Sequence, residues 1–281
     1  AFKGMRDKVY IATKTAATTP EDFWKDLETS LEKLQTEYID VYQFHCVGQC
    51  YKPGDGTGMY ECMLEAKKQG KIRHIGVTAH KIGIAYACVE SGLYETMQFP
   101  FSYLSGPQEI KLVQMCQEAN MGFVCMKGLA GGLISNSRAA MAYMCQYPDI
   151  LPIWGIQKEK ELEEWLSYMS DTPCMDEETA AFIAKEQEEL SGDFCRGCGY
   201  CMPCPQGITI NQCARMSLML RRAPSEAWLN AYWQKEMAKI ETCLNCNACK
   251  AKCPYELDTP ALLQKNLEDY KNVLAGKTKV Q

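Results

Sequence analysis

The stretch Ile39-Asp40-Val41-Tyr42-Gln43-Phe44-His45 places β-branched and aromatic residues in a run that is too short for a helix. Such a run predicts a β-strand. Five similar runs occur at residues 9–13, 72–77, 96–99, 122–126 and 150–154. Amphipathic segments separate the runs, and Thr19 followed by Pro20 marks the start of one predicted helix. Regular alternation of strand and helix predicts a parallel sheet covered by helices.

Six strand–helix units fit an open doubly wound sheet by number alone. That fold binds dinucleotides through a G-x-G-x-x-G turn after a strand, and no predicted strand is followed by that motif. The sequence therefore offers no dinucleotide fingerprint of this type.

The chain has 281 residues, 17 of them cysteine, and a formal net charge of −5. An acidic balance without a basic block argues against nucleic acid as a partner. No signal peptide and no apolar run of about 18 residues is evident, so we expect no membrane partner. An odd cysteine count argues against a disulfide framework and favours a reducing cytoplasm in which thiolates bind metal.

Eight of the cysteines form two tight runs near the C-terminus. The first is Cys195-x2-Cys198-x2-Cys201-x2-Cys204-Pro205 and the second is Cys243-x2-Cys246-x2-Cys249-x3-Cys253-Pro254. In two-cluster ferredoxins, three closely spaced cysteines bind one [4Fe–4S] cluster and the fourth binds the other cluster. We therefore assign Cys195, Cys198, Cys201 and Cys253 to one cluster, and Cys243, Cys246, Cys249 and Cys204 to the second.

The alternative is a pair of four-cysteine zinc sites, which two runs of four could also make. Doubling of the motif and its Cys-Pro ends favour iron–sulfur clusters, although the final gap of the first run is one residue short. Gly197, Gly199, Asn245 and Asn247 separate the ligands and suit tight turns. Between the runs, Asn211 is expected to cap a helix through Arg222, and Pro224 to begin another reaching about Ile240.

The predicted strands also resemble those of a known family. The segments Val9-Tyr10-Ile11-Ala12-Thr13-Lys14, Ile39–His45 and Gly70-Lys71-Ile72-Arg73-His74-Ile75-Gly76-Val77-Thr78 look like strands three, four and five of the aldo/keto reductases. Gly128-Leu129-Ala130-Gly131-Gly132-Leu133 is similar to their loop after strand seven. The further resemblance is to a bacterial branch with a C-terminal two-cluster ferredoxin-like domain.

The resemblance implies a TIM-type (β/α)8 barrel with catalytic groups at the carboxyl ends of its strands. Six of its eight units fall in this chain, so residues 1–190 are expected to form a partial barrel. Residues 191–281 are expected to form a mainly helical ferredoxin-like domain with two [4Fe–4S] clusters. We expect the chain to be a truncated version of a longer family member.

In the family, a tyrosine acts as general acid beside a lysine, with an aspartate and a histidine holding it in place. Lys14 matches that lysine and His45 that histidine. An ammonium beside a phenol favours the phenolate and lowers its pKa toward the working range. The aspartate and the tyrosine belong to the first two units, so this chain is expected to lack them.

The resemblance also implies cofactor contacts. Thr78 and Gln98 match positions that hold a nicotinamide carboxamide, Lys127 follows the position of a stacking aromatic residue, and Glu164 matches an adenine contact. Glu161 replaces the arginine that binds a 2′-phosphate in the family. NAD(P)H is therefore a candidate cofactor, and a flavin stays an alternative because barrels bind its phosphate with loops of little signature.

These inferences predict an oxidoreductase that reduces a carbonyl or another small organic substrate, with electrons relayed through two [4Fe–4S] clusters. A redox-partner protein is then a candidate partner alongside the small-molecule substrate. The alternative is an electron-transfer iron–sulfur protein whose barrel serves for docking rather than catalysis.

Overall fold

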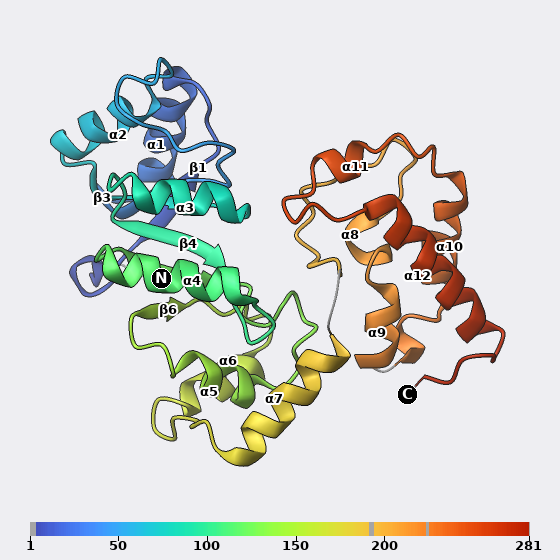
Figure 1. The fold of residues 1–281 in the computed structure, drawn as a ribbon. Coiled ribbons are helices and arrows are strands. Elements are labelled where there is room, and N and C mark those ends of the chain that lie inside the picture. Colours follow the sequence, from blue (N-terminus) through green and yellow to red (C-terminus); the bar gives the residue numbers. More distant parts are fainter. Residues whose placement is uncertain (1–3, 191–193, 223–224, 281) are drawn as a thin grey trace. The chain divides into compact units, whose positions relative to one another are not determined.

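The computed structural model describes residues 4–190, 194–222 and 225–280 of the chain. These residues form two compact units (Figure 1). The first unit comprises Ala1–Phe101, Ser105–Met126 and Tyr147–Gly155, and the second comprises Ser102–Leu104, Lys127–Gln146 and Ile156–Gln281. The parallel sheet belongs to the first unit, and both cysteine runs belong to the second.

The sheet has six strands, all parallel, and they follow one another in chain order. The strands are β1 (Ala12–Thr15), β2 (Ile39–Phe44), β3 (Ile72–Thr78), β4 (Thr96–Pro100), β5 (Gly122–Met126) and β6 (Ile150–Pro152). A doubly wound sheet would reverse its strand order at a switch point, and this sheet does not. The order is that of consecutive units of a β/α barrel, which confirms the predicted fold class.

Helices α1 (Pro20–Leu34), α2 (Met59–Lys68), α3 (Ile82–Glu90) and α4 (Pro107–Glu118) connect successive strands. The start of α1 is as predicted, because the Thr19 side chain accepts a hydrogen bond from the backbone N–H of Asp22 and Pro20 is the first helical residue. Phe23 and two leucines four and eight residues later form its buried face. The Phe23 ring lies 5.7 Å from that of Tyr42 on β2, which fixes the helix against the sheet.

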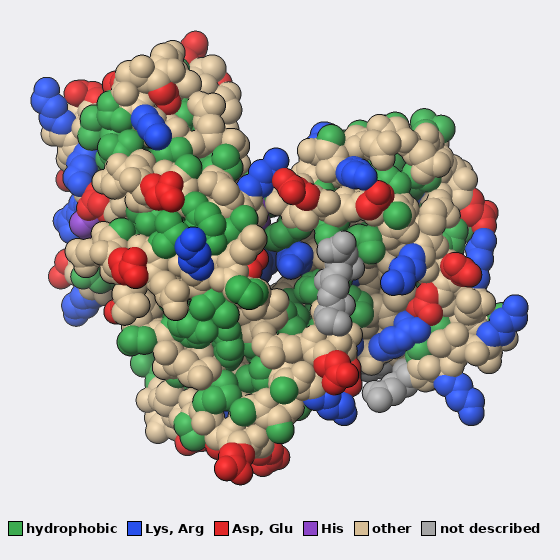
Figure 2. Space-filling model, in the orientation of Figure 1, with side chains coloured by type: hydrophobic (Ala, Val, Ile, Leu, Met, Phe, Trp, Pro, Cys, Tyr) green, Lys and Arg blue, Asp and Glu red, His purple; other side chains and the backbone are tan. Residues whose placement is uncertain are grey.

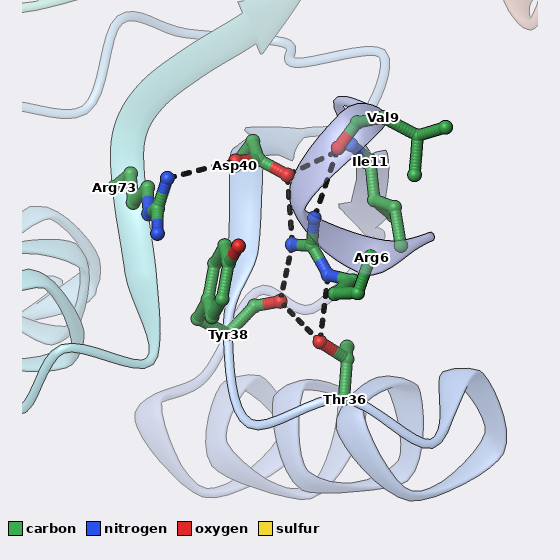
Figure 3. A network of polar contacts seen from close by, with 7 residues as sticks. All are labelled: Arg6, Val9, Ile11, Thr36, Tyr38, Asp40 and Arg73. Carbon is green, nitrogen blue, oxygen red and sulfur yellow. Dashed lines mark hydrogen bonds and ion pairs between the residues drawn. The ribbon is translucent and has the colours of Figure 1, made fainter. Parts of the chain in front are cut away.

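The first strand starts later than predicted. A polar network at the amino ends of the strands explains the difference (Figure 3). Arg6 donates to Asp40 Oδ2 at 2.7 Å and to the carbonyl of Val9 at 3.0 Å. The same carboxylate accepts the N–H of Ile11 at 2.9 Å. Side chains thus bind the backbone of Val9 and Ile11. The carbonyl of Ile11 already accepts the N–H groups of Asp40 and Val41, and the regular register with β2 begins at Ala12.

Tyr38 lies at the centre of this network. The guanidinium carbon of Arg6 lies 3.9 Å from the centroid of the Tyr38 ring, and that of Arg73 lies 3.8 Å from it. Arg73, on β3, also lies 3.5 Å from Asp40 Oδ1. Two cations and a buried carboxylate therefore link β2 and β3 to the segment before β1.

Gly76, in the middle of β3, leaves room that two neighbouring side chains occupy. A Cβ at this position would lie 2.3 Å from Thr96 Oγ1 and 2.9 Å from Gln43 Cγ. Gly76→Ala should destabilise the protein by about 1–3 kcal/mol, because both neighbours would have to move. Urea unfolding measures this. Gly83→Ala is the control, since a Cβ there meets nothing within 4 Å on α3, and a loss as large as that of Gly76→Ala would contradict the explanation.

The second unit is helical in its described residues. Its helices are α5 (Ser137–Met144), α6 (Glu159–Ser167), α7 (Glu177–Glu189), α8 (Ile210–Cys213), α9 (Met216–Arg222), α10 (Ala231–Ala238), α11 (Ala248–Ala251) and α12 (Thr259–Leu274). Short 3-10 turns occupy Ser225–Ala227 and Lys239–Thr242. Met216, Leu220, Met237 and Leu263 are fully buried at the centre of the C-terminal core.

The segment between the cysteine runs differs from its prediction. The single helix expected from Asn211 to Arg222 is two short helices, α8 and α9. Helix α10 starts at Ala231, where the Asn230 side chain accepts the N–H of Trp233 at 3.1 Å. Pro224, the predicted start of that helix, lies outside the described residues.

Candidate functional site

Four predicted site residues lie together at the carboxyl ends of the first four strands. Lys14 lies in β1 beside Gln43 of β2, and His45 follows β2, its N–H bonded to the carbonyl of Thr15 at 2.8 Å. Thr78 and Gln98 face each other in the register of β3 and β4. In β/α barrels, this edge of the sheet carries the active site.

Lys14 affects the protonation of His45. Both residues are partly buried. Burial lowers the pKa of His45, and the nearby ammonium group of Lys14 lowers it further. The lowered pKa favours the neutral imidazole at pH 7, which carries one N–H donor and one acceptor nitrogen.

Thr78 has a structural task at this edge. Its hydroxyl accepts the N–H of Cys46 at 2.7 Å, and its carbonyl accepts the N–H of Val47 at 3.0 Å. The loop that follows β2 is thereby fixed to the end of β3. The hydroxyl can still donate its own proton, because a hydroxyl carries a donor as well as acceptor lone pairs.

Gln98 is buried, with 6% of the residue's surface exposed. Its Nε2 lies 3.5 Å from the sulfur of Met126 at the end of β5. A thioether is a weak acceptor, so the amide has hydrogen-bonding capacity to spare. Of the predicted nicotinamide contacts, Gln98 has the side chain that is least committed to the fold.

Lys127 and Glu164 belong to the second unit. Lys127 has a left-handed backbone, with φ of 60°, and its carbonyl accepts the N–H of Ala130 at 2.7 Å. Glu164, on α6, accepts hydrogen bonds from the hydroxyls of Ser137 and Tyr168. Their predicted roles toward a cofactor stay predictions.

Glu161 has a local role. Its carboxylate accepts the N–H groups of Gln157 at 2.8 Å and Lys158 at 3.2 Å, which caps the start of α6. These hydrogen bonds lower the pKa of Glu161 and keep the carboxylate charged. A fixed negative charge here would disfavour a 2′-phosphate.

The eight clustered cysteines line two pockets. Cys195, Cys198, Cys201 and Cys253 line one pocket. Cys204, Cys243, Cys246 and Cys249 line the other, where Cys201 also contributes. The grouping matches the two predicted ligand sets, including the exchange of the fourth cysteine between runs.

The backbone between the cysteines suits ligand loops. Gly197, Gly199, Asn245 and Asn247 have positive φ values of 67°, 82°, 50° and 58°. The N–H of Gly197 points to Cys195 Sγ at 3.4 Å. Amide groups directed at thiolate sulfurs are a feature of iron–sulfur sites, so the loops fit the chemistry of the proposed group.

Within residues 4–190, 194–222 and 225–280, no three His, Cys, Asp or Glu side chains gather closely enough to hold one metal ion. A four-iron cluster needs a wider arrangement, because each thiolate binds a different iron atom. The two pockets also differ in exposure: Cys195 of the first is buried, whereas Cys246 of the second is exposed.

Two arginines beside the first pocket carried no signal in the sequence. Arg196 lines the pocket, and its guanidinium lies between the rings of Phe194 and Tyr255, at 4.7 and 4.5 Å. Arg215 is buried and donates to the carbonyl of Gly131 at 2.5 Å. Arg196 occupies a variable position of the first cysteine run and Arg215 lies outside both runs, so only the folded chain reveals where their guanidinium groups lie.

Comparison with known proteins matches two stretches of the chain. Residues 1–147 match the model of the aldo/keto reductase family, and residues 194–258 match that of a 4Fe-4S dicluster domain. The first match covers more than half of the chain, and the chain belongs to the aldo/keto reductase family. It also carries a 4Fe-4S dicluster domain.

Curated relatives match only in part. Aldo-keto reductase YhdN of Bacillus subtilis is 29% identical over 143 residues, which cover 47% of this chain and 42% of that protein. Methylglyoxal reductase DkgB of Salmonella typhi is 36% identical over 108 residues, covering 34% of this chain and 38% of that protein. The chain thus spans about two fifths of the length of these relatives.

Solved structures support the fold. Aldo-keto reductase AKR11C1 from Bacillus halodurans, in its apo form, superimposes with a TM-score of 0.56 at 22% identity. The alignment covers 66% of this chain and 74% of that one. Its holo form gives a TM-score of 0.57 at 21% identity.

Two further expectations concern partners. None of the described helices has the length and apolar character needed to cross a membrane. Figure 2 shows lysine, arginine, aspartate and glutamate side chains interspersed over the visible face, without a continuous basic tract.

Proposed function

We propose that the protein is an oxidoreductase that reduces a carbonyl or another small organic group, with electrons relayed through two [4Fe–4S] clusters. The observation that carries this proposal is the gathering of Lys14, His45, Thr78 and Gln98 at one edge of a parallel sheet. Membership of the aldo/keto reductase family and the dicluster domain support it.

Lys14 and His45 are suited to a reaction at a polarised oxygen. The Lys14 ammonium would stabilise negative charge that develops on a substrate oxygen. The neutral His45 imidazole would orient that oxygen by donating a hydrogen bond. Both would act with the proton donor that the resemblance assigns to the first two barrel units.

The clusters would be held by residues of the segment 191–281. Cys195, Cys198, Cys201 and Cys253 would bind one cluster, and Cys204, Cys243, Cys246 and Cys249 the other. Each cluster supplies one electron at a time, whereas a nicotinamide supplies a hydride. A reaction that uses both therefore needs a flavin or a radical intermediate. Thiolates for eight ligand positions also favour a reducing compartment such as the cytoplasm.

Cofactor binding tests the reductase part of the proposal. The purified protein is titrated with NADH, NADPH and FMN while cofactor fluorescence is followed. We expect nicotinamide binding, which Gln98→Leu should weaken roughly three- to tenfold through the loss of a hydrogen bond. Gln117→Leu is the control, because the Gln117 amide donates to Asp149, which precedes the amino end of β6 rather than a carboxyl end of the strands.

A protein that binds none of the three cofactors would contradict the reductase. If it nevertheless holds about eight iron and eight sulfide per chain, the second candidate function applies. This is electron transfer with the barrel used for docking. The exposed Cys246 and Leu244, the latter 65% exposed, favour it by placing one cluster site at the surface.

A further inference from the structure

Arg215 is a buried cation that forms an ion pair with no carboxylate of the described residues. It is 8% exposed, and its guanidinium donates to Gly131 O at 2.5 Å and to Gln212 Oε1 at 3.0 Å. Both acceptors are neutral, and no Asp or Glu in the described ranges forms an ion pair with it. An uncompensated buried charge is costly.

Neighbouring arginines show the usual arrangement. Arg221 pairs with Asp269 at 2.6 Å, and Arg222 pairs with Glu186 on α7. Arg215 lies one residue before the helix that carries these two, yet its charge faces the first cysteine loop. A Cβ on Gly197 would lie 2.8 Å from Arg215 Nη1, so the guanidinium packs directly on the backbone between Cys195 and Cys198.

A cluster bound at the first cysteine loop would place a negative charge beside this guanidinium. A [4Fe–4S] cluster with four thiolates is an anion in its oxidised and its reduced form. Arg196 adds a second cation at the rim of the same pocket. The pocket lined by Cys204, Cys243, Cys246 and Cys249 has no charged residue among its described lining residues.

This asymmetry changes how easily each site accepts an electron. Reduction adds one negative charge, which a nearby guanidinium stabilises. Burial of the first site opposes this, since it disfavours added charge. A full cation in contact with the ligand loop has the larger effect, because charges interact strongly where water is excluded.

Building on the proposed function, we propose that Arg215, with Arg196, gives the cluster at Cys195, Cys198, Cys201 and Cys253 the higher reduction potential. An electron that enters at the more exposed cluster is then transferred to the cluster at Cys195, Cys198, Cys201 and Cys253, which we call the inner cluster. Cys201 lines both pockets, so the two sites adjoin. Arg215 also bonds to Gly131 of the loop 128–133, and it is therefore a positioning residue between the inner cluster and that loop.

A redox titration of the iron-loaded protein, followed by electron paramagnetic resonance, tests this inference. Arg215→Gln should lower the equilibrium constant for reduction of the more easily reduced cluster about tenfold. This corresponds to a fall of 59 mV in its reduction potential, for one electron. The other cluster should be unaffected. Arg215→Lys should restore most of the difference, and Arg196→Gln should shift the same cluster less, because Arg196 is more exposed.

Arg221→Gln is the matched control and should move neither potential, because its charge is already paired with Asp269. The inference is overturned if Arg215→Gln leaves both potentials unchanged, shifts both equally, or shifts the less easily reduced cluster. If Arg215→Gln fails to retain iron, the same criteria apply to Arg196→Gln. Absence of iron and sulfide from the unaltered protein would instead overturn the proposed function itself.

Discussion

Replacing Cys253 with serine should remove the cluster at the first cysteine run, although Cys253 lies in the second run. Cys253 lines the pocket of Cys195, Cys198 and Cys201. Iron content should fall from about eight to about four atoms per chain, because a cubane needs all four ligands for stable binding. Iron and sulfide analysis measures the loss.

Spectroscopy identifies which cluster is lost. The remaining cluster in Cys253→Ser should be the one whose potential is insensitive to Arg215→Gln. Cys204→Ser should give the converse result, since Cys204 lines the other pocket. Cys213→Ser is the control, because Cys213 is buried and lines neither of these pockets. Equal loss of both clusters in Cys213→Ser would contradict the ligand sets, and bound zinc would contradict the clusters.

Asp40→Asn should lower the free energy of unfolding by about 2–3 kcal/mol. The carboxylate is almost fully buried and holds Arg6 at 2.7 Å, with Arg73 at 3.5 Å. An amide of the same shape can still accept the N–H of Ile11, but it leaves both guanidiniums without their counter-charge. Urea unfolding at neutral pH measures the change.

The exposed pair of Asp171 and Arg138 provides the comparison. Asp171→Asn should cost no more than about 1 kcal/mol, because both side chains are mainly in water. If the two aspartate variants lost equal stability, the network in Figure 3 would not be a major source of stability.

The stabilisation by Asp40 should depend on pH in a defined direction. Burial alone would raise the pKa of Asp40, but the N–H of Ile11 and the charges of Arg6 and Arg73 more than offset this and lower it. A lowered pKa in the folded state contributes stability that is complete above the unfolded value of about 3.9. The difference between the protein and Asp40→Asn should therefore be constant near pH 7 and shrink only as the pH falls below about 4.

Much of the fold was predictable because its signals are local. Most strands lie in short runs rich in β-branched or aromatic residues, and Thr19 and Pro20 mark the start of α1 as expected. The shift of β1 to Ala12–Thr15 was not predictable, because it depends on Arg6 reaching Asp40, 34 residues away. The break between α8 and α9 was likewise not predictable, because it contains no proline or glycine.

The grouping of the eight cysteines around two pockets was predictable because the gaps in each run resemble those of two-cluster ferredoxins, and their binding of clusters stays a prediction. The strand-end group depended on resemblance, since a single lysine or histidine has no pattern of its own. Arg215 could not be found in either way. Its proposed role depends on its distance from Gly197 and on the absence of a carboxylate partner in the described residues. No local sequence pattern predicts either feature.

The two outer strands of the sheet have a practical consequence for handling the protein. Within the described residues, β1 and β6 each pair with one strand only, and Leu151 of β6 is 63% exposed. A row of unpaired backbone groups beside an exposed leucine is a template for adding strands from other molecules. Preparations of these 281 residues alone are therefore expected to self-associate as concentration rises, and dilute conditions are the better choice for every measurement described above.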